Sequence, residues 1–190
     1  MRADESGAIG EAAAALARGE LVAFPTDTVY GLAAGHGHIK QLFVVKQRPS
    51  EKRIPVLLAD AANLDASAIV TPTARRLAER FWPGPLTIVL TAPGRGTLAF
   101  RVPDHPVARQ LLAASGGGLP VTSANRSGGP ECRTAQEVLA QLGGRIELVL
   151  DGGAATSGVV STVVDCSGEQ LVILRQGAIP RDALLEAAAV

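Results

Sequence analysis

The chain has 190 residues, of which 47% are hydrophobic and 19% are charged, a composition typical of a folded globular protein with a sizeable core. The 18 basic and 18 acidic residues balance to a formal net charge of zero, and aromatic residues make up only 3%. Dedicated nucleic-acid-binding modules usually carry a basic excess and exposed aromatic rings. The composition therefore counts against that class of protein.

Membrane and disulfide-rich classes are also disfavoured. No apolar run approaches the roughly 18 residues that a membrane-spanning helix needs. The alanine run that follows Asp4 and Glu5 is too short for the apolar region of a signal peptide. The two cysteines, Cys132 and Cys166, are far apart and in no C-x-x-C spacing, which argues against a zinc site or a disulfide framework. We therefore expect a cytoplasmic protein without a membrane partner.

Apolar periodicity and turn residues predict a chain of interleaved helices and strands. Helices are expected at residues 9–16, 39–46, 71–82, 106–114, 134–142 and 180–188. Strands are expected at residues 21–24, 54–59, 86–90, 98–102, 119–122, 146–150, 161–165 and 171–174. Because some strands follow each other directly, the pattern predicts an α/β fold with a twisted mixed sheet flanked by helices.

Two polar stretches follow the first predicted strand and the second predicted helix. Residues 24–32 read Phe-Pro-Thr-Asp-Thr-Val-Tyr-Gly-Leu, and a tight turn and a ligand-binding loop are both consistent with them. Residues 46–53 hold four cations, and the only lysines of the chain (Lys40, Lys46 and Lys52) lie in this neighbourhood. Lysine is a compact charge suited to phosphate, although cations at a helix end also complement the helix dipole.

Two further stretches combine small polar residues with glycine. Residues 121–128 follow a predicted strand, the position where open α/β sheets bind ligands, although the same residue types form ordinary turns. Residues 151–158 are glycine-rich and are followed by polar residues at 161–162 and 174–177. Glycines let backbone N–H groups approach an anion, but the chain contains neither a Walker A sequence nor a G-x-S-x-G nucleophile elbow.

Taken in order, these stretches resemble the YrdC/TsaC family of threonylcarbamoyl-AMP synthases. The resemblance covers nearly the whole chain, and its end matches the end of the short bacterial members, so we expect a single YrdC-like domain over residues 1–190. The matching motifs are Phe24–Leu32, Lys46-x-Arg48-Pro49, Trp82-Pro83-Gly84-Pro85-Leu86-Thr87, Thr97-x-x-x-Arg101-Val102-Pro103-x-His105-Pro106, Ser123-Ala124-Asn125-x-Ser127-Gly128, Asp151-Gly152-Gly153, Ser161-Thr162 and Leu174-Arg175-x-Gly177.

The resemblance implies an L-threonylcarbamoyladenylate synthase, a nucleotidyltransferase. Such an enzyme makes threonylcarbamoyl-AMP and pyrophosphate from L-threonine, bicarbonate and ATP, for modification of the tRNA adenosine next to the anticodon. The residues implied as catalytic are Lys46, Arg48, Ser123 and Asn125. The residues implied for ATP are Arg48, Lys52, Thr97, Ser123, Ser161 and Arg175, and those implied for threonine are Thr28, Arg101 and Val121.

The same resemblance suggests the partners of the reaction. Mg²⁺ is expected to arrive with ATP, because the sequence shows no dedicated carboxylate cage. A downstream threonylcarbamoyl-transfer machinery would take the product, and a weak contact with tRNA is compatible with this role. The alternative from another class is an RNA-binding or ribosome-maturation factor that uses the same cleft, and the zero net charge and scarce aromatic residues count against it.

Overall fold

The computed structural model describes residues 1–189 as six α-helices, one short 3-10 helix and nine strands. The helices are α1 (Ala8–Ala17), α2 (Lys40–Lys46), η1 (Ala61–Asn63), α3 (Pro72–Phe81), α4 (Pro106–Ala114), α5 (Ala135–Leu142) and α6 (Arg181–Ala189). The strands are β1 (Val22–Phe24), β2 (Gly31–Ala33), β3 (Val56–Leu58), β4 (Leu86–Ala92), β5 (Gly96–Arg101), β6 (Gly118–Ser123), β7 (Leu148–Val149), β8 (Thr162–Asp165) and β9 (Val172–Arg175). None of the helices described is both long and apolar enough to cross a bilayer.

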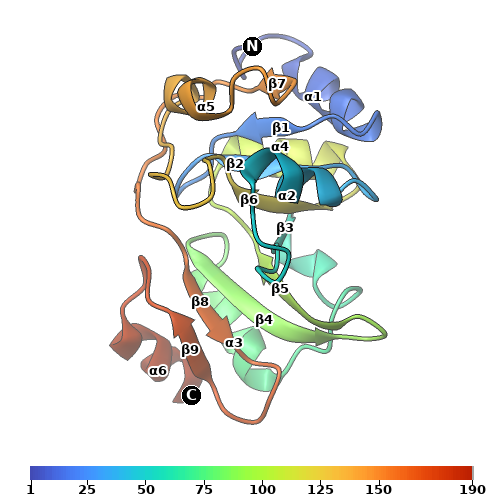
Figure 1. Cartoon of the computed structure of the whole chain (residues 1–190). Coiled ribbons are helices and arrows are strands. Elements are labelled where there is room, and N and C mark those ends of the chain that lie inside the picture. Colours follow the sequence, from blue (N-terminus) through green and yellow to red (C-terminus); the bar gives the residue numbers. More distant parts are fainter. Residues whose placement is uncertain (190) are drawn as a thin grey trace.

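The nine strands form one mixed sheet in the order β7-β1-β2-β6-β3-β5-β4-β8-β9 (Figure 1). The pairs β1–β7, β3–β5 and β4–β8 are parallel. The other neighbouring pairs are antiparallel. The predicted α/β fold with a mixed sheet and flanking helices is therefore confirmed.

Helices cover both faces of the sheet around β1. Side chains alternate between the two faces of a strand, and β1 is buried on both. Val22 and Phe24 belong to a core cluster that includes residues of α1 and α4. Leu21 and Ala23 belong to a second cluster that includes residues of α2 and α5. This half of the sheet is thus a three-layer structure, with β1 packed between helices on both faces.

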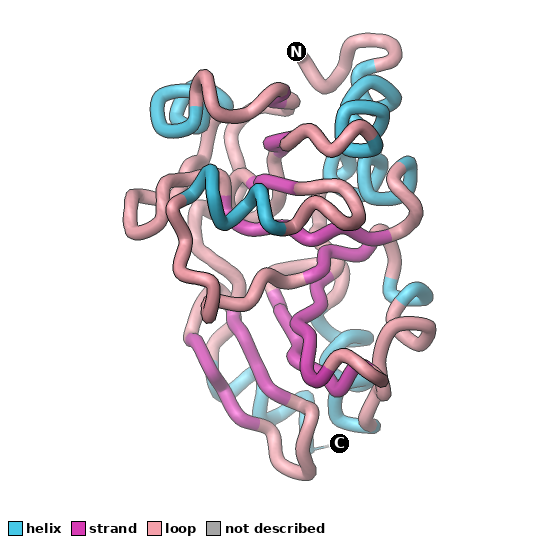
Figure 2. Tube along the Cα trace, turned by 45° about the vertical axis from the view of Figure 1, so that its right-hand side comes forward, coloured by secondary structure: helices cyan, strands magenta, loops and turns pink. Residues whose placement is uncertain are grey.

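Helices cover only one face of the sheet around β4. Leu86, Ile88 and Leu90 pack into a third core cluster with residues of α3 and α6. Figure 2 shows these strands in front of the helices that cover their rear face. Thr87 and Val89, the alternate residues of β4, face the other side and line a cavity. The exposed face of this half-sheet therefore forms the floor of a cleft.

The local sequence explains where several elements begin. Thr71 accepts a hydrogen bond from the backbone N–H of Ala74 at 3.2 Å, with Pro72 in the first turn of α3. Thr134 and Glu137 form a reciprocal capping box at the start of α5, as predicted.

One strand was not predicted from the sequence. β2 begins inside the stretch 24–32, which was read as a turn or a loop, and it was missed because Gly31 and Ala33 have weak strand propensity. Pairing with β1 and β6 on either side makes it a strand. A Cβ atom on Gly31 would lie 2.9 Å from Val121 Cγ1, so the close approach of β2 and β6 favours glycine here.

Candidate functional site

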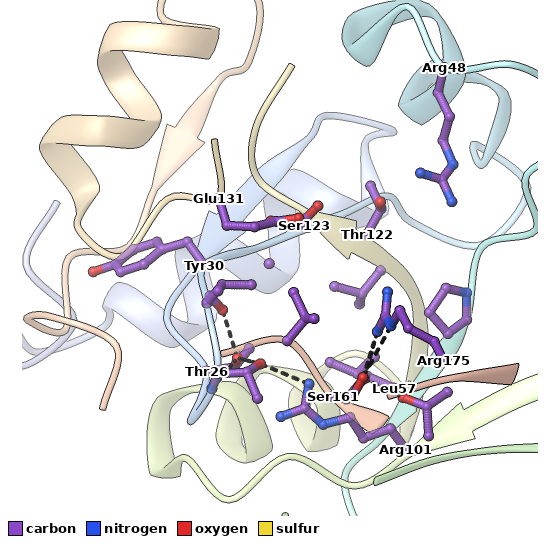
Figure 3. A pocket seen from close by; sticks show the side chains of 17 residues that line it. Thr26, Tyr30, Arg48, Leu57, Arg101, Thr122, Ser123, Glu131, Ser161 and Arg175 are labelled. Atoms are coloured by element: carbon purple, nitrogen blue, oxygen red, sulfur yellow. Dashed lines mark hydrogen bonds between the residues drawn. The ribbon is translucent and has the colours of Figure 1, made fainter. Parts of the chain in front are cut away.

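Two adjoining cavities lie over the exposed face of the sheet. The first, which we call the Arg101 pocket, has a volume of about 200 Å³ and lies between the β1–β2 turn, β6 and β8. The second, the Thr97 pocket, has a volume of about 450 Å³ and lies over β4, β5, β8 and β9. They share the lining residues Arg48, Pro55, Thr87, Ser161 and Arg175, so they form one cleft. Figure 3 shows the side chains that line the Arg101 pocket.

Arg101 is the buried cation of the first pocket, with only 6% of its surface exposed. Its Nε donates to the Gly84 carbonyl at 3.0 Å, its Nη1 to Thr28 Oγ1 at 2.9 Å and its Nη2 to Asp27 Oδ1 at 2.5 Å. Burial lowers the pKa of Arg101, and the charge of Asp27 opposes that shift. Because a guanidinium carries five N–H donors, two remain for an anion in the pocket.

Arg175 and Ser161 form the junction between the two pockets. Arg175 Nη2 donates to the Ser161 carbonyl at 2.8 Å and to Ser161 Oγ at 3.1 Å, and Ser161 Oγ lies 2.8 Å from Thr87 Oγ1 (Figure 3). Gly177 approaches the Ser161 backbone so closely that a Cβ atom there would collide with it. Burial lowers the pKa of Arg175, and Glu131 opposes the shift. The junction thus carries a cation bonded to Ser161, whose backbone is packed against Gly177.

Arg48 reaches the cleft because α2 ends at a left-handed residue. Gln47 adopts a φ of 52°, which turns the chain out of the helix before Arg48. Arg48 then donates from Nε to the Lys52 carbonyl at 3.2 Å and from Nη2 to the Arg53 carbonyl at 3.1 Å. Burial, followed by the charge of Arg175, lowers the pKa of Arg48. Because the charge of Arg175 disfavours the charge of Arg48, an anion bound beside Arg48 would stabilise its protonated form.

Arg53 extends the positive charge over the second pocket. Its Nη1 donates to the Thr97 carbonyl at 2.7 Å and also contacts Thr97 Oγ1. The Thr97 pocket is therefore lined by three arginines, Arg48, Arg53 and Arg175, against one carboxylate, Asp165. The Asp165 carboxylate itself accepts hydrogen bonds from the backbone and hydroxyl of Ser167, at 2.8 and 2.6 Å.

Lys46 lies buried beneath the end of β6, with 2% of its surface exposed. Its Nζ donates to the Asn125 carbonyl at 2.5 Å, to Asn125 Oδ1 at 2.9 Å and to the Ser123 carbonyl. Asn125 Oδ1 also accepts from Ser123 Oγ at 2.6 Å, and Asn125 Nδ2 donates to the Gly129 carbonyl at 2.8 Å. Burial lowers the pKa of Lys46 to about 8. The ammonium group thus holds the loop that presents Ser123 to the cleft.

Comparison with known proteins identifies the family of the chain. A family model for Sua5, YciO and YrdC proteins, described as telomere recombination, matches residues 14–177. The chain belongs to the Sua5/YciO/YrdC family. It is 40% identical over 188 residues to the threonylcarbamoyl-AMP synthase of Bacillus subtilis, which covers 92% of this chain and 54% of that protein. It is 37% identical over 178 residues to the threonylcarbamoyl-AMP synthase of Vibrio vulnificus, covering 86% of this chain and 95% of that protein.

A solved structure of the family carries an amino acid. The structure of Pyrococcus abyssi Sua5 complexed with L-threonine superposes with a TM-score of 0.88 at 38% identity. The match covers 94% of this chain and 56% of that one. The chain thus spans about half the length of the Bacillus and Pyrococcus relatives, and nearly the whole of the Vibrio relative.

The structure brings most of the residues expected for this family to one cleft. Thr28, Arg101, Val121 and Ser123 line the Arg101 pocket, Thr97 lines the Thr97 pocket, and Arg48, Ser161 and Arg175 line both. Lys46 and Asn125 lie behind the lining rather than in it. Lys52 is exposed and lines neither pocket, although its carbonyl holds Arg48.

Several residues of the cleft were not predicted. Thr26, Asp27 and Tyr30 fall in the polar stretch 24–32, which signalled a loop but not their roles. Thr87 alternates with buried residues along β4, and only the open face of the sheet reveals its place. Arg53 belongs to the cationic stretch 46–53, which indicated a phosphate site but not its contact with Thr97. No sequence signal indicated Glu131.

The cleft does not hold a ready-made metal cage. Within residues 1–189, no three His, Cys, Asp or Glu side chains converge on one point. The two carboxylates that line the cleft, Glu131 and Asp165, belong to different pockets. Such a donor set suits a cation that arrives with most of its ligands already supplied by a bound phosphate and water.

Proposed function

We propose that this protein is an L-threonylcarbamoyladenylate synthase. It would condense L-threonine, bicarbonate and ATP to threonylcarbamoyl-AMP and pyrophosphate, the class of reaction catalysed by a nucleotidyltransferase. Membership of the Sua5/YciO/YrdC family and the names of the Bacillus and Vibrio relatives support this assignment. We further propose that residues 1–190 act as one YrdC-like domain in the cytoplasm and that a separate transfer machinery delivers the product to the tRNA adenosine.

The observation that carries the proposal is the division of one cleft into a small and a large cationic pocket. The Arg101 pocket, at about 200 Å³, suits an amino acid whose carboxylate meets the remaining N–H groups of Arg101. The Thr97 pocket, at about 450 Å³, suits a nucleotide whose phosphates meet Arg48 and Arg175. ATP and a threonine carboxylate together bring about five negative charges, so a neutral chain must gather its cations locally.

The shared lining of the two pockets supplies the geometry for the reaction. The threonine amine would attack the carbon of bicarbonate, forming a C–N bond while a C–O bond breaks and the departing hydroxide takes the amine proton and leaves as water. With carbon dioxide the same C–N bond forms and the amine proton passes to water. A carbamate oxygen would then attack the α-phosphorus of ATP while the bond to the bridging oxygen breaks and pyrophosphate leaves. Arg48 and Arg175, which line both pockets, lie where charge would develop between the substrates. No covalent intermediate with the protein is required, so catalysis would come from positioning and charge stabilisation.

Mg²⁺ would neutralise phosphate charge in this scheme. It would reach the cleft on ATP, and Glu131 or Asp165 would be the carboxylates available to it or to its water ligands. Lys46 and Asn125 would act through Ser123, whose loop they hold in place. Lys52 lines neither pocket and is exposed. It would attract the phosphates of ATP through the long-range electrostatic field of its charge and through its flexible side chain.

The test is a pyrophosphate-release assay with single omissions. We expect release to require ATP, L-threonine and bicarbonate together and to need no tRNA. Omitting threonine and omitting bicarbonate are the two controls against simple ATP hydrolysis. A strict requirement for tRNA would overturn the proposal and favour the RNA-binding alternative.

A further inference from the structure

A line of three side chains runs from the Arg101 pocket into the β1–β2 turn. Thr26 Oγ1 lies 2.6 Å from the Val29 carbonyl, 3.0 Å from Thr28 Oγ1 and 3.2 Å from the backbone nitrogen of Thr28. Both threonines line the pocket, yet only 3% of Thr26 and 1% of Thr28 is exposed. Two of the three side chains are thus buried hydroxyls, and each has few hydrogen-bond partners within reach.

The hydroxyl proton of Thr26 can be assigned to a single hydrogen bond. A hydroxyl carries one proton and accepts through two lone pairs. The Val29 carbonyl can only accept, and it is the nearest partner of Thr26 Oγ1, so the Thr26 proton lies on that contact. The contact between the two hydroxyls must then be donated by Thr28.

The other end of the line has a fixed direction as well. Arg101 Nη1 donates to Thr28 Oγ1 at 2.9 Å, and a guanidinium has no acceptor to offer in return. Hydrogen bonds therefore run one way, from Arg101 through Thr28 and Thr26 to the Val29 carbonyl. Thr28 is left with one free lone pair and no free proton. Figure 3 shows Arg101 and Thr26 joined through this line of contacts.

We propose that Thr26 sets the hydrogen-bond polarity of the Arg101 pocket. By taking the Thr28 proton, it makes Thr28 an acceptor only, so this wall of the pocket recognises an N–H or O–H donor and disfavours a carboxylate oxygen. The carboxylate of the ligand is thereby directed to the N–H groups of Arg101. The inference rests on the proposed function, in which the ligand is L-threonine and the donor is its amine or its side-chain hydroxyl. Thr26 is thus a positioning residue that determines orientation.

The polarity can be observed directly by neutron diffraction on crystals of the full chain exchanged into D₂O. We expect the Thr28 deuteron on the line to Thr26 Oγ1 and the Thr26 deuteron on the line to the Val29 carbonyl. A Thr28 deuteron that points into the pocket would overturn the proposal. This experiment needs no substrate and no variant, so its outcome is independent of whether the proposed function is right.

The consequence for binding can be measured with two variants of Thr26. Thr26→Val keeps the side-chain volume but removes the acceptor, which frees the Thr28 proton to turn into the pocket, whereas Thr26→Ser keeps the hydroxyl. For Thr26→Val we expect L-threonine affinity to fall roughly 2- to 12-fold by calorimetry, the range of a single hydrogen bond, with ATP affinity unchanged. Thr26→Ser should bind both as the unaltered protein does. ATP binding and thermal melting report whether Thr26→Val is folded.

A second ligand identifies the donor. L-2-aminobutyrate matches threonine but lacks the hydroxyl. If Thr26→Val loses affinity equally for both ligands, the amine is the donor. If only the affinity for threonine falls, the side-chain hydroxyl is the donor. Either result supports the proposal. Unchanged threonine affinity in a folded Thr26→Val protein would overturn it. If the unaltered protein binds no threonine at all, the proposed function fails, and the neutron experiment still decides the polarity.

Discussion

Lys46 Nζ donates to Asn125 Oδ1 at 2.9 Å, and both side chains are almost wholly buried behind the cleft. The same ammonium group donates to the backbone carbonyls of Ser123 and Asn125. All three of its N–H groups are therefore used within the protein. We therefore expect Lys46 to act on the reaction by holding the loop that follows β6, rather than by touching a substrate.

Replacing Lys46 with Met should lower both stability and turnover. The change removes the ammonium donor from the Ser123 and Asn125 carbonyls and from Asn125 Oδ1, which keeps only its bond from Ser123 Oγ. Each buried acceptor left unpaired costs about 1–3 kcal/mol. We expect a clearly lower melting temperature, with kcat falling because the Ser123 loop loses its anchor. Lys40→Met at the exposed start of α2 is the matched control and should change neither quantity. A normal melting temperature and normal turnover in Lys46→Met would show that Lys46 does not anchor the Ser123 loop.

Turnover should fall as the pH rises through about 8, because burial lowers the pKa of Lys46 to about 8 from 10.5. The protonated amine has three N–H donors for three acceptors, and the neutral amine has only two. We expect kcat to decline reversibly on the alkaline side in the unaltered protein. A kcat that stays constant to about pH 9 would contradict this assignment.

The same shift predicts an opposite trend in stability. The folded-state pKa of Lys46 is depressed, and an unfolded lysine keeps the ordinary value of 10.5. Between about pH 8 and 10.5 the unfolded chain therefore binds more protons, so the contribution of Lys46 to the free energy of unfolding increases with pH. Comparing chemical denaturation of the unaltered protein and Lys46→Met across this window isolates that contribution. The alkaline loss of kcat is thus expected without unfolding.

Arg101→Lys should weaken threonine far more than ATP. Lysine keeps the charge but cannot reproduce the planar fork that contacts Gly84, Thr28 and Asp27. Loss of a charge-assisted contact to the carboxylate should raise the KM for threonine roughly 10- to 150-fold. The control is Arg109→Lys, a half-buried arginine outside the cleft whose carboxylate partner Asp60 lies 3.5 Å away. An equal rise in the KM for ATP would show that Arg101 does not serve threonine.

Thr134→Ala should reduce stability without affecting turnover. Thr134 accepts from the Glu137 backbone N–H at 3.2 Å and begins α5, away from the cleft. Loss of such a cap costs about 1 kcal/mol. Chemical denaturation should show that loss, and Thr134→Ser, which keeps the hydroxyl, should show little. A fall in kcat at full folding would be inconsistent with a purely structural cap.

The helix boundaries were predictable because their signals are local. Thr71 with Pro72, and Thr134 with Glu137, lie within a few residues of the backbone groups that they satisfy. β2 could not be recognised, because its three residues become a strand only through partners on both sides. Short-range patterns therefore gave the helices and most strands, and the missing strand needed the assembled sheet.

The composition of the site was also predictable, but the depth of its residues was not. Lys46 and Arg48 are two positions apart, and sequence reasoning gave both the same catalytic role. The left-handed turn at Gln47 separates the two side chains. Arg48 lines the cleft, whereas Lys46 is buried against the loop that contains Asn125, 79 residues further along the chain. Which of the two nearby cations lines the cleft is decided by that turn and that long-range contact.

Mass spectrometry of the product tests the proposed reaction most directly. The protein would be incubated with ATP, L-threonine and ¹³C-bicarbonate, without tRNA, and the nucleotide fraction analysed at once. We expect an AMP adduct that carries one threonine and one ¹³C atom, together with pyrophosphate, and we expect neither when threonine is omitted. Pyrophosphate or AMP that forms without a threonine- and ¹³C-containing adduct would contradict the assignment.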